Sequence, residues 1–131
     1  MYPLRALLIG CPDDVLAELR HELANLSVTI EQEFLDVRSC LSYMFANADM
    51  NRLLILCPAS AAETTQLEQL NELAIGQPIL ALVDPTNDPS LMVRAMRAGA
   101  AQVVRLPLQA DDFRVAMQRI AIQFGHPLNQ S

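Results

Sequence analysis

Five short apolar runs alternate with five amphipathic stretches along nearly the whole chain, and this alternation restricts the fold more than any other feature. The runs cover residues 4–9, 28–34, 53–56, 79–83 and 103–106. Short apolar runs that end at glycine, proline or polar residues predict buried strands. Strands that alternate with helices predict a parallel sheet with helices on both faces. We therefore expect an α/β fold, a three-layer α/β/α sandwich around a five-stranded parallel sheet.

The stretches between the runs carry the signals of helices. We expect helices over residues 12–26, 37–48, 61–75 and 91–98, and a last helix from 109 or 111 to 124. Asp36 is suited to cap the second helix, and Ser60 with Glu63 has the spacing of a capping box before the third. The helical periodicity places Phe45 and Leu73 on the faces that pack against the sheet. The half-polar run at 28–34 predicts an exposed edge strand.

Length and composition indicate one domain. The 131 residues match the usual size of a single domain, and 52% of them are apolar, which is enough for one continuous core. No apolar run approaches the roughly 18 residues that span a bilayer, so we expect no membrane insertion. The three cysteines have no metal-ligand spacing, which fits a reducing, cytoplasmic location. We assign the domain to residues 1–125 and a tail or the start of a linker to 126–131.

Charge is unevenly distributed along the chain. The net charge is −6, all nine basic residues are arginines and lysine is absent. Residues 89–119 hold five of those arginines but only two acidic residues. An acidic chain without a basic stripe argues against direct binding of nucleic acid. The local excess of arginine instead favours docking on an acidic protein partner or on a second copy of the chain.

The stretch from Pro78 to Leu108 resembles the end of a response-regulator receiver domain. The resemblance depends on Ala95-Met96-Arg97-Ala98-Gly99-Ala100, on Leu106-Pro107-Leu108 at the end of a strand, and on Asp111-Asp112 at a helix start. The fivefold alternation extends it along residues 4–124. In that family the fold is flavodoxin-like with strand order 2-1-3-4-5, and the resemblance implies the same order here.

Receiver phosphorylation requires an acidic pair after the first strand, an aspartate ending the third, a hydroxyl residue after the fourth and a lysine before the last proline. This chain departs from that set at nearly every position. The aspartate position falls on Leu56 or Cys57, the hydroxyl on Val83 and the lysine on Leu106, while the acidic residues come two positions late. The degenerate positions are Cys11, Asp13, Asp14, Leu56, Cys57, Val83 and Leu106. We therefore predict a phosphorylation-incompetent module that has no enzymatic activity and no cofactor.

The segment Arg-Leu-Pro-Leu at residues 105–108 is similar to the atypical receiver at the N-terminus of CpaE/TadZ-type pilus-assembly proteins. A ParA/MinD-like ATPase usually follows that domain, fused to it or as a separate protein, and this chain has no phosphate-binding loop of its own. The resemblance implies dimerisation, localisation or regulation in a pilus-assembly or secretion ATPase system. The alternative is a pseudo-receiver regulator in two-component or clock-type signalling.

A candidate interface follows from the same resemblance, because receivers commonly dimerise through the fourth helix, the fifth strand and the fifth helix. The charged residues expected on that face are Arg94, Arg97, Arg105, Asp111 and Asp112. We predict a homodimer through this face, or contact with an acidic partner. The competing interpretation is an ordinary solvated surface, on which ion pairs contribute little.

Two further alternatives concern the carboxyl ends of the strands. Asp13, Asp14 and Asp84 have the oxygen ligands that Mg²⁺ prefers, although two of them also suit the positive end of a helix. Cys11 and Cys57 lie at one edge of the sheet if their strands are neighbours, within reach of a disulfide; the competing interpretation is two small buried hydrophobic residues. A weak Mg²⁺- or thiol-dependent enzyme is the functional alternative that these residues leave open.

Overall fold

The computed structural model describes residues 4–48, 51–86 and 88–125, so the predicted tail at 126–131 lies outside the described residues. The strands are β1 (Arg5–Ile9), β2 (Thr29–Phe34), β3 (Arg52–Leu56), β4 (Ile79–Val83) and β5 (Gln102–Arg105). The helices are α1 (Asp13–Asn25), α2 (Val37–Ala46), α3 (Ala61–Leu73), α4 (Leu91–Arg97) and α5 (Ala110–Phe124). All strand pairs are parallel, in the order β2-β1-β3-β4-β5. The predicted fold class and strand order are confirmed.

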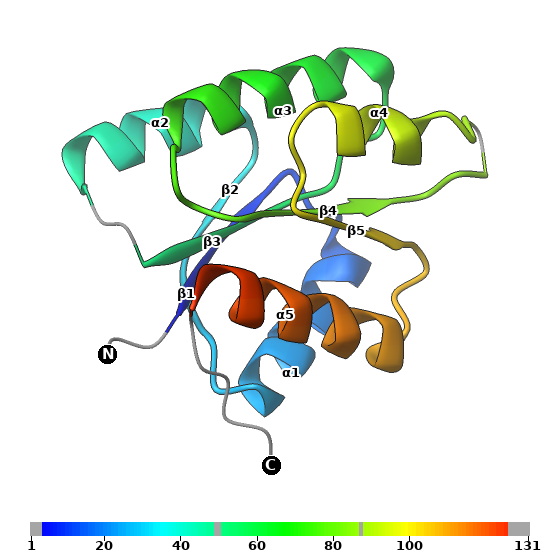
Figure 1. Cartoon of the computed structure of the whole chain (residues 1–131), viewed down its shortest axis with the longest axis horizontal. Helices are drawn as coiled ribbons and strands as arrows, with labels where there is room; N and C mark the ends of the chain where they lie inside the picture. The colour runs from blue at the N-terminus through cyan, green and yellow to red at the C-terminus, as the bar shows by residue number, and fades with distance from the viewer. Residues whose placement is uncertain (1–3, 49–50, 87, 126–131) are drawn as a thin grey trace.

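The helices cover both faces of the sheet, with α1 and α5 on one side and α2, α3 and α4 on the other (Figure 1). Side chains of a central strand alternate between the two layers. In β3, Leu53 and Ile55 pack towards α1 and α5, whereas Leu54 and Leu56 pack towards α2, α3 and α4. Because both faces are covered, every position of β3 and β4 is buried, which explains their continuous apolar runs.

Local capping explains where several helices begin. The Asp36 carboxylate accepts a hydrogen bond from the Ser39 backbone N–H at 2.8 Å, as predicted for α2. At α3, the Ser60 hydroxyl accepts from the Glu63 N–H at 3.3 Å, while the Glu63 carboxylate accepts from the N–H of Ala59 instead of Ser60. The first helix starts one residue later than predicted, since Pro12 occupies its N-cap position. Short-range sequence signals thus place most helix starts correctly.

Two side chains predicted to face the sheet are exposed. Phe45 is 79% exposed and Leu73 is 57% exposed. Each lies about 80–100° around its helix axis from the centre of the buried stripe, because a helix turns ~100° per residue. Both instead border an open, mostly apolar cavity of about 170 Å³ between the ends of α2 and α3. In the described parts of the chain, no helix combines the length and apolar character needed to cross a membrane.

A β-bulge interrupts the pairing of β2 with β1. Ala6 lies opposite Ile30, but the next residue, Leu7, lies opposite Gln32, so Glu31 is the extra residue. A bulge of this kind shifts the alternation of side chains along the strand. Ile30 packs with the α1 and α5 layer, whereas Glu31 reaches the α2 side, where it meets Tyr43. The edge-strand prediction for this segment is confirmed by its mixture of exposed and half-buried positions.

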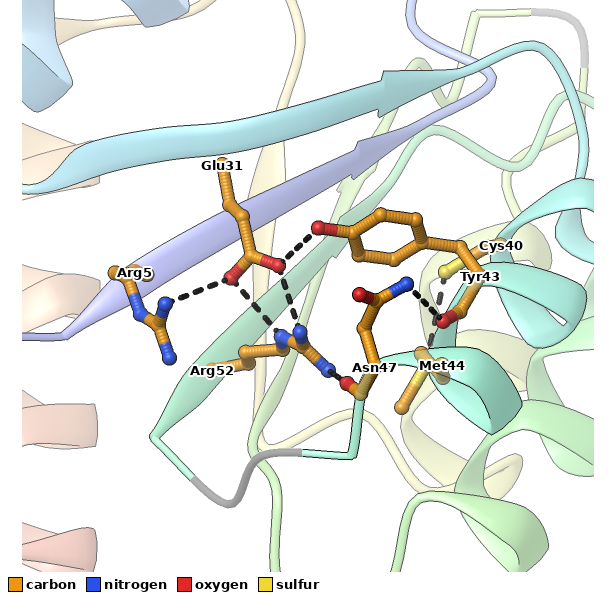
Figure 2. Close-up of polar contacts among 7 residues, drawn as sticks. All are labelled: Arg5, Glu31, Cys40, Tyr43, Met44, Asn47 and Arg52. Atoms are coloured by element: carbon orange, nitrogen blue, oxygen red, sulfur yellow. Dashed lines mark hydrogen bonds and ion pairs between the residues drawn. The ribbon is translucent and has the colours of Figure 1, made fainter.

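The Glu31 carboxylate lies against the guanidinium of Arg52, which begins β3 (Figure 2). Arg52 donates to the two Glu31 oxygens at 3.0 and 2.6 Å, and also to the carbonyl of Asn47. The Tyr43 hydroxyl donates to Glu31, and Arg5 lies 3.4 Å from the same carboxylate. Only 3% of the Arg52 side chain and 13% of the Glu31 side chain are exposed.

This cluster places a carboxylate beside two positive charges that the pairing of β1 with β3 brings together. Arg5 and Arg52 are register partners on adjacent strands, so two positive charges stand side by side at the amino end of the sheet. A buried charge is strongly destabilising unless it is paired and hydrogen-bonded. Glu31 supplies the compensating charge, and the hydrogen bonds from Arg52 hold the pKa of Glu31 below its usual range. We infer that Glu31 is a structural residue of the first three strands.

Replacement of Glu31 by alanine is expected to lower the free energy of unfolding by about 3–5 kcal/mol, because it leaves the Arg52 charge buried without its partner. Urea denaturation measures the change. Glu33→Ala is the matched control on the same strand: its partner Arg20 is exposed, and loss of that pair is expected to cost no more than about 1 kcal/mol. Equal losses in the two variants would contradict the assignment.

The same carboxylate predicts a pH dependence. Because the pKa of Glu31 in the folded protein is lower than its ordinary value of 4.5, its contribution is complete above that value and is lost as the pH falls through the folded-state pKa. We expect the stability difference between the wild type and Glu31→Gln to be constant near neutral pH and to shrink in acid below about pH 4.5. Unfolding free energies measured from pH 7 to pH 3 test this. A difference that stays constant over that range is the contrary result.

Candidate functional site

The carboxyl ends of the strands meet at one edge of the sheet, the edge where ligands bind in parallel α/β sheets. An open cleft of about 380 Å³ lies there, between the segments that follow β1, β3, β4 and β5. Its polar or reactive wall residues are Asp14, Glu18, Cys57 and Asp84. Leu82, Leu91 and Leu106 line the apolar part of the cleft. The structure therefore gathers the predicted strand-end segments around one cleft.

Side-chain alternation decides which strand-end residues face the cleft. Leu56 and Val83 end β3 and β4, but both are buried in the layer of α2, α3 and α4 and do not line the cleft. The residue after each strand does so instead, Cys57 after β3 and Asp84 after β4. Leu106, which stands at the predicted lysine position, also lines the cleft. Of the two residues left open for the acceptor position, Cys57 is the one that borders the cleft.

The three aspartates proposed as Mg²⁺ ligands have other arrangements. Asp13 and Asp14 lie in the first turn of α1, where their charge complements the helix dipole, and only Asp14 borders the cleft. The Asp84 carboxylate accepts the Thr86 N–H at 2.9 Å. Hydrogen bonds from the Thr86 side chain and backbone lower the pKa of Asp84. Among the described residues, no three His, Cys, Asp or Glu side chains are grouped so that they could hold a metal ion.

Cys11 and Cys57 lie in direct contact. The Cys57 thiol donates to the Cys11 sulfur, with 3.1 Å between the two Sγ atoms, and the Cys11 thiol donates to the Ile9 carbonyl at 3.7 Å. Adjacent strands create this contact, since Ile9 pairs with Leu56 and the Cys57 N–H donates to the Ile9 carbonyl at 3.3 Å. Gly10 then turns the chain with a φ of +65°, a conformation that glycine adopts without strain.

The predicted interface residues are all exposed, but they do not form one cluster. Arg94 and Arg97 line a cavity of about 400 Å³ together with Glu68 of α3, so they lie on the α3 side of α4. Arg105 leaves the end of β5, and Asp111 and Asp112 occupy the first turn of α5. The five charged residues are thus divided between two surfaces, which sequence spacing alone did not indicate.

The backbone is similar to solved receiver domains. A signal receiver domain of an HD domain-containing protein from Pseudomonas fluorescens aligns with a TM-score of 0.77 and 16% identity, over 95% of this chain and 98% of that chain. A pilus assembly-related protein from Burkholderia pseudomallei aligns with a TM-score of 0.76 and 22% identity, over 94% and 95%. A CheY-like receiver domain protein from Methanospirillum hungatei aligns with a TM-score of 0.74 and 17% identity, over 95% and 98%.

The fold is that of a response-regulator receiver domain. At these identities the similarity concerns the fold. Neither a protein-family model nor a curated protein matches the sequence. Within the receiver fold, the cleft described above occupies the edge at which the resemblance places the phosphorylation residues. Its chemistry has to be inferred from the side chains of this chain.

Proposed function

We propose that this chain is a receiver-fold module that works through protein contacts and does not accept a phosphoryl group. The observation that carries the proposal is the composition of the cleft at the strand ends. Cys57 borders it where the receiver resemblance requires a carboxylate, and Leu106 borders it where that resemblance requires a lysine. An aliphatic side chain cannot neutralise the charge that develops on a phosphoryl group in transfer. The module accordingly acts without catalysis and without a cofactor.

Two aspartates, Asp14 and Asp84, border the cleft together with Glu18. Asp14 complements the positive end of α1, and Asp84 is held by its own turn through the Thr86 N–H. Mg²⁺ is usually held by carboxylates together with substrate phosphates. Both aspartates thus have structural roles that do not depend on phosphoryl chemistry.

The cellular context that we propose is a pilus-assembly or secretion ATPase system. Two observations support it: the Arg-Leu-Pro-Leu segment at residues 105–108, and the likeness to the pilus assembly-related protein from Burkholderia pseudomallei. In such a system the module contributes dimerisation, localisation or regulation, and a fused or separate ParA/MinD-like ATPase is the partner. We propose a cytoplasmic location for it.

The interface that we propose for self-association comprises α4, β5 and the start of α5. We assign to this interface Arg105, the acidic pair Asp111 and Asp112, and Met96, which is 63% exposed. A two-fold interface brings the same patch of both copies together, so the arginine of one copy can meet the acidic pair of the other. Complementary charge of this kind favours a specific partner over other surfaces.

Treatment with acetyl phosphate and Mg²⁺ is expected to leave the intact mass of the protein unchanged, because no acceptor carboxylate is supported by a lysine. The measurement is intact-mass spectrometry of the folded protein after this treatment. A receiver domain that can be phosphorylated serves as the positive control for the phosphoryl donor. A stable adduct of about 80 Da, the mass of one phosphoryl group, would overturn the proposal.

Arg105→Glu is expected to raise the dimer dissociation constant by about tenfold or more, because it places like charges across the proposed interface. Arg97→Glu is the matched control: it makes the same charge change on the α3 side of α4, and we expect less than about a twofold effect. Sedimentation equilibrium over a range of concentrations measures both. A monomer at all concentrations, or equal effects of the two variants, would contradict this interface.

A further inference from the structure

We propose that Cys11 and Cys57 form a redox modification site, at which a hydroperoxide converts the two thiols into an intramolecular disulfide across the carboxyl ends of β1 and β3. The inference goes beyond the proposed function and does not depend on it, because it concerns the reactivity of two side chains and not a partner. It rests on their geometry, on access from the surface and on the contrast with the third cysteine.

The geometry requires little movement. The two Sγ atoms are 3.1 Å apart, so they must approach by about 1 Å to reach the ~2.0 Å of a disulfide bond. The strands that carry them are already hydrogen-bonded neighbours, with Ile9 paired to Leu56. Each cysteine is followed by a proline, Pro12 or Pro58, which favours an extended backbone at the cysteine. The protein therefore holds both thiols in place before any oxidant arrives.

The two sulfurs differ in exposure, and this assigns their roles. Cys11 is half-buried and lines an open cavity of about 490 Å³ beside β2, through which a small oxidant can reach it. Cys57 is 9% exposed and borders the cleft on the other side. Its hydrogen bond to Cys11, together with burial, raises the pKa of Cys57 well above its usual range, so Cys57 remains a thiol. We therefore assign the first step to Cys11 and the second to Cys57.

The chemistry balances with a hydroperoxide as the two-electron oxidant. The Cys11 sulfur attacks the peroxide, an S–O bond forms, the O–O bond breaks, and the alcohol or water leaves with the Cys11 proton. The Cys57 sulfur then attacks the resulting sulfenic acid, an S–S bond forms, the S–O bond breaks, and water leaves with the Cys57 proton. Two thiols and one hydroperoxide thus yield one disulfide, one alcohol or water, and one further water.

Cys40 provides an internal comparison. It is fully buried in the layer of α2, α3 and α4, and its thiol donates to the Met44 sulfur at 3.8 Å. Burial raises the pKa of Cys40 to about 12, and no other cysteine shares its layer. Since it has neither access nor a partner thiol, Cys40 should remain reduced under conditions that oxidise the other two.

The test uses the whole chain, first reduced and then exposed to hydrogen peroxide, with alkylation under denaturing conditions and intact-mass measurement. Before alkylation we expect the oxidised chain to be about 2 Da lighter than the reduced chain. Alkylation should then label one thiol in place of three, and a non-reducing gel should show a monomer. Peptide mapping should link Cys11 to Cys57. The disulfide closes a long loop, so the melting temperature should rise by several degrees and return to its starting value with reductant.

Three variants locate the reaction. Cys40→Ser should lose two thiols as the wild type does, whereas Cys11→Ser and Cys57→Ala should form no intramolecular disulfide. Cooperative thermal unfolding in reductant checks that each variant is folded, and the peptide map of the wild type needs no variant. Three alkylatable thiols after peroxide treatment, a disulfide-linked dimer, over-oxidation of Cys11 without a crosslink, or a bond that includes Cys40 would each overturn the proposal.

Discussion

The burial of Arg52 at the start of β3 is the constraint on which the arrangement of the first three strands depends. Its guanidinium is almost fully enclosed and requires a carboxylate. That carboxylate comes from Glu31, two strands away across β1, at the position where β2 is bulged. Tyr43 of α2 and Arg5 of β1 complete the cluster. One ionic cluster therefore ties an otherwise polar edge strand and a helix to the centre of the sheet.

The opposite end of the sheet has a different chemistry. The strands there end in aliphatic residues that belong to the core, and the residues one position later face the cleft. A single step along a strand moves a side chain from one face to the other. For this reason Cys57 and Asp84 border the cleft while Leu56 and Val83 do not. The Cys57 thiol also contacts Cys11, which lines a separate cavity beside β2. The receiver fold is retained while the side chains at its usual site differ.

The arginines that are close together in the sequence do not all lie on one surface of the folded protein. Five arginines concentrated in one part of the chain suggested one basic face, yet Arg94 and Arg97 lie beside α3 while Arg105 extends from β5. Arg94 and Arg97 are three residues apart on α4 and therefore share one side of the helix, whereas Arg105 ends a strand. The residues of an interface on this fold therefore have to be chosen by their positions on the surface of the structure, because residues from one segment of the sequence lie on different surfaces.

The sequence by itself determined the features that depend on local chemistry: the alternation of strands and helices, the cap at Asp36, the edge character of β2, and, through the receiver resemblance, the strand order. Only the tertiary structure decided the features that depend on register between distant segments. The extra residue at Glu31, the outward faces of Phe45 and Leu73, the pairing of Arg52 with Glu31, and the choice of Cys57 over Leu56 at the cleft all belong to this group. No local pattern encodes them, because each depends on how two strands align or on how far a helix rotates over the sheet. The contact between Cys11 and Cys57 stands between the two cases, since neighbouring strands suggested it but only their register brought the sulfurs together.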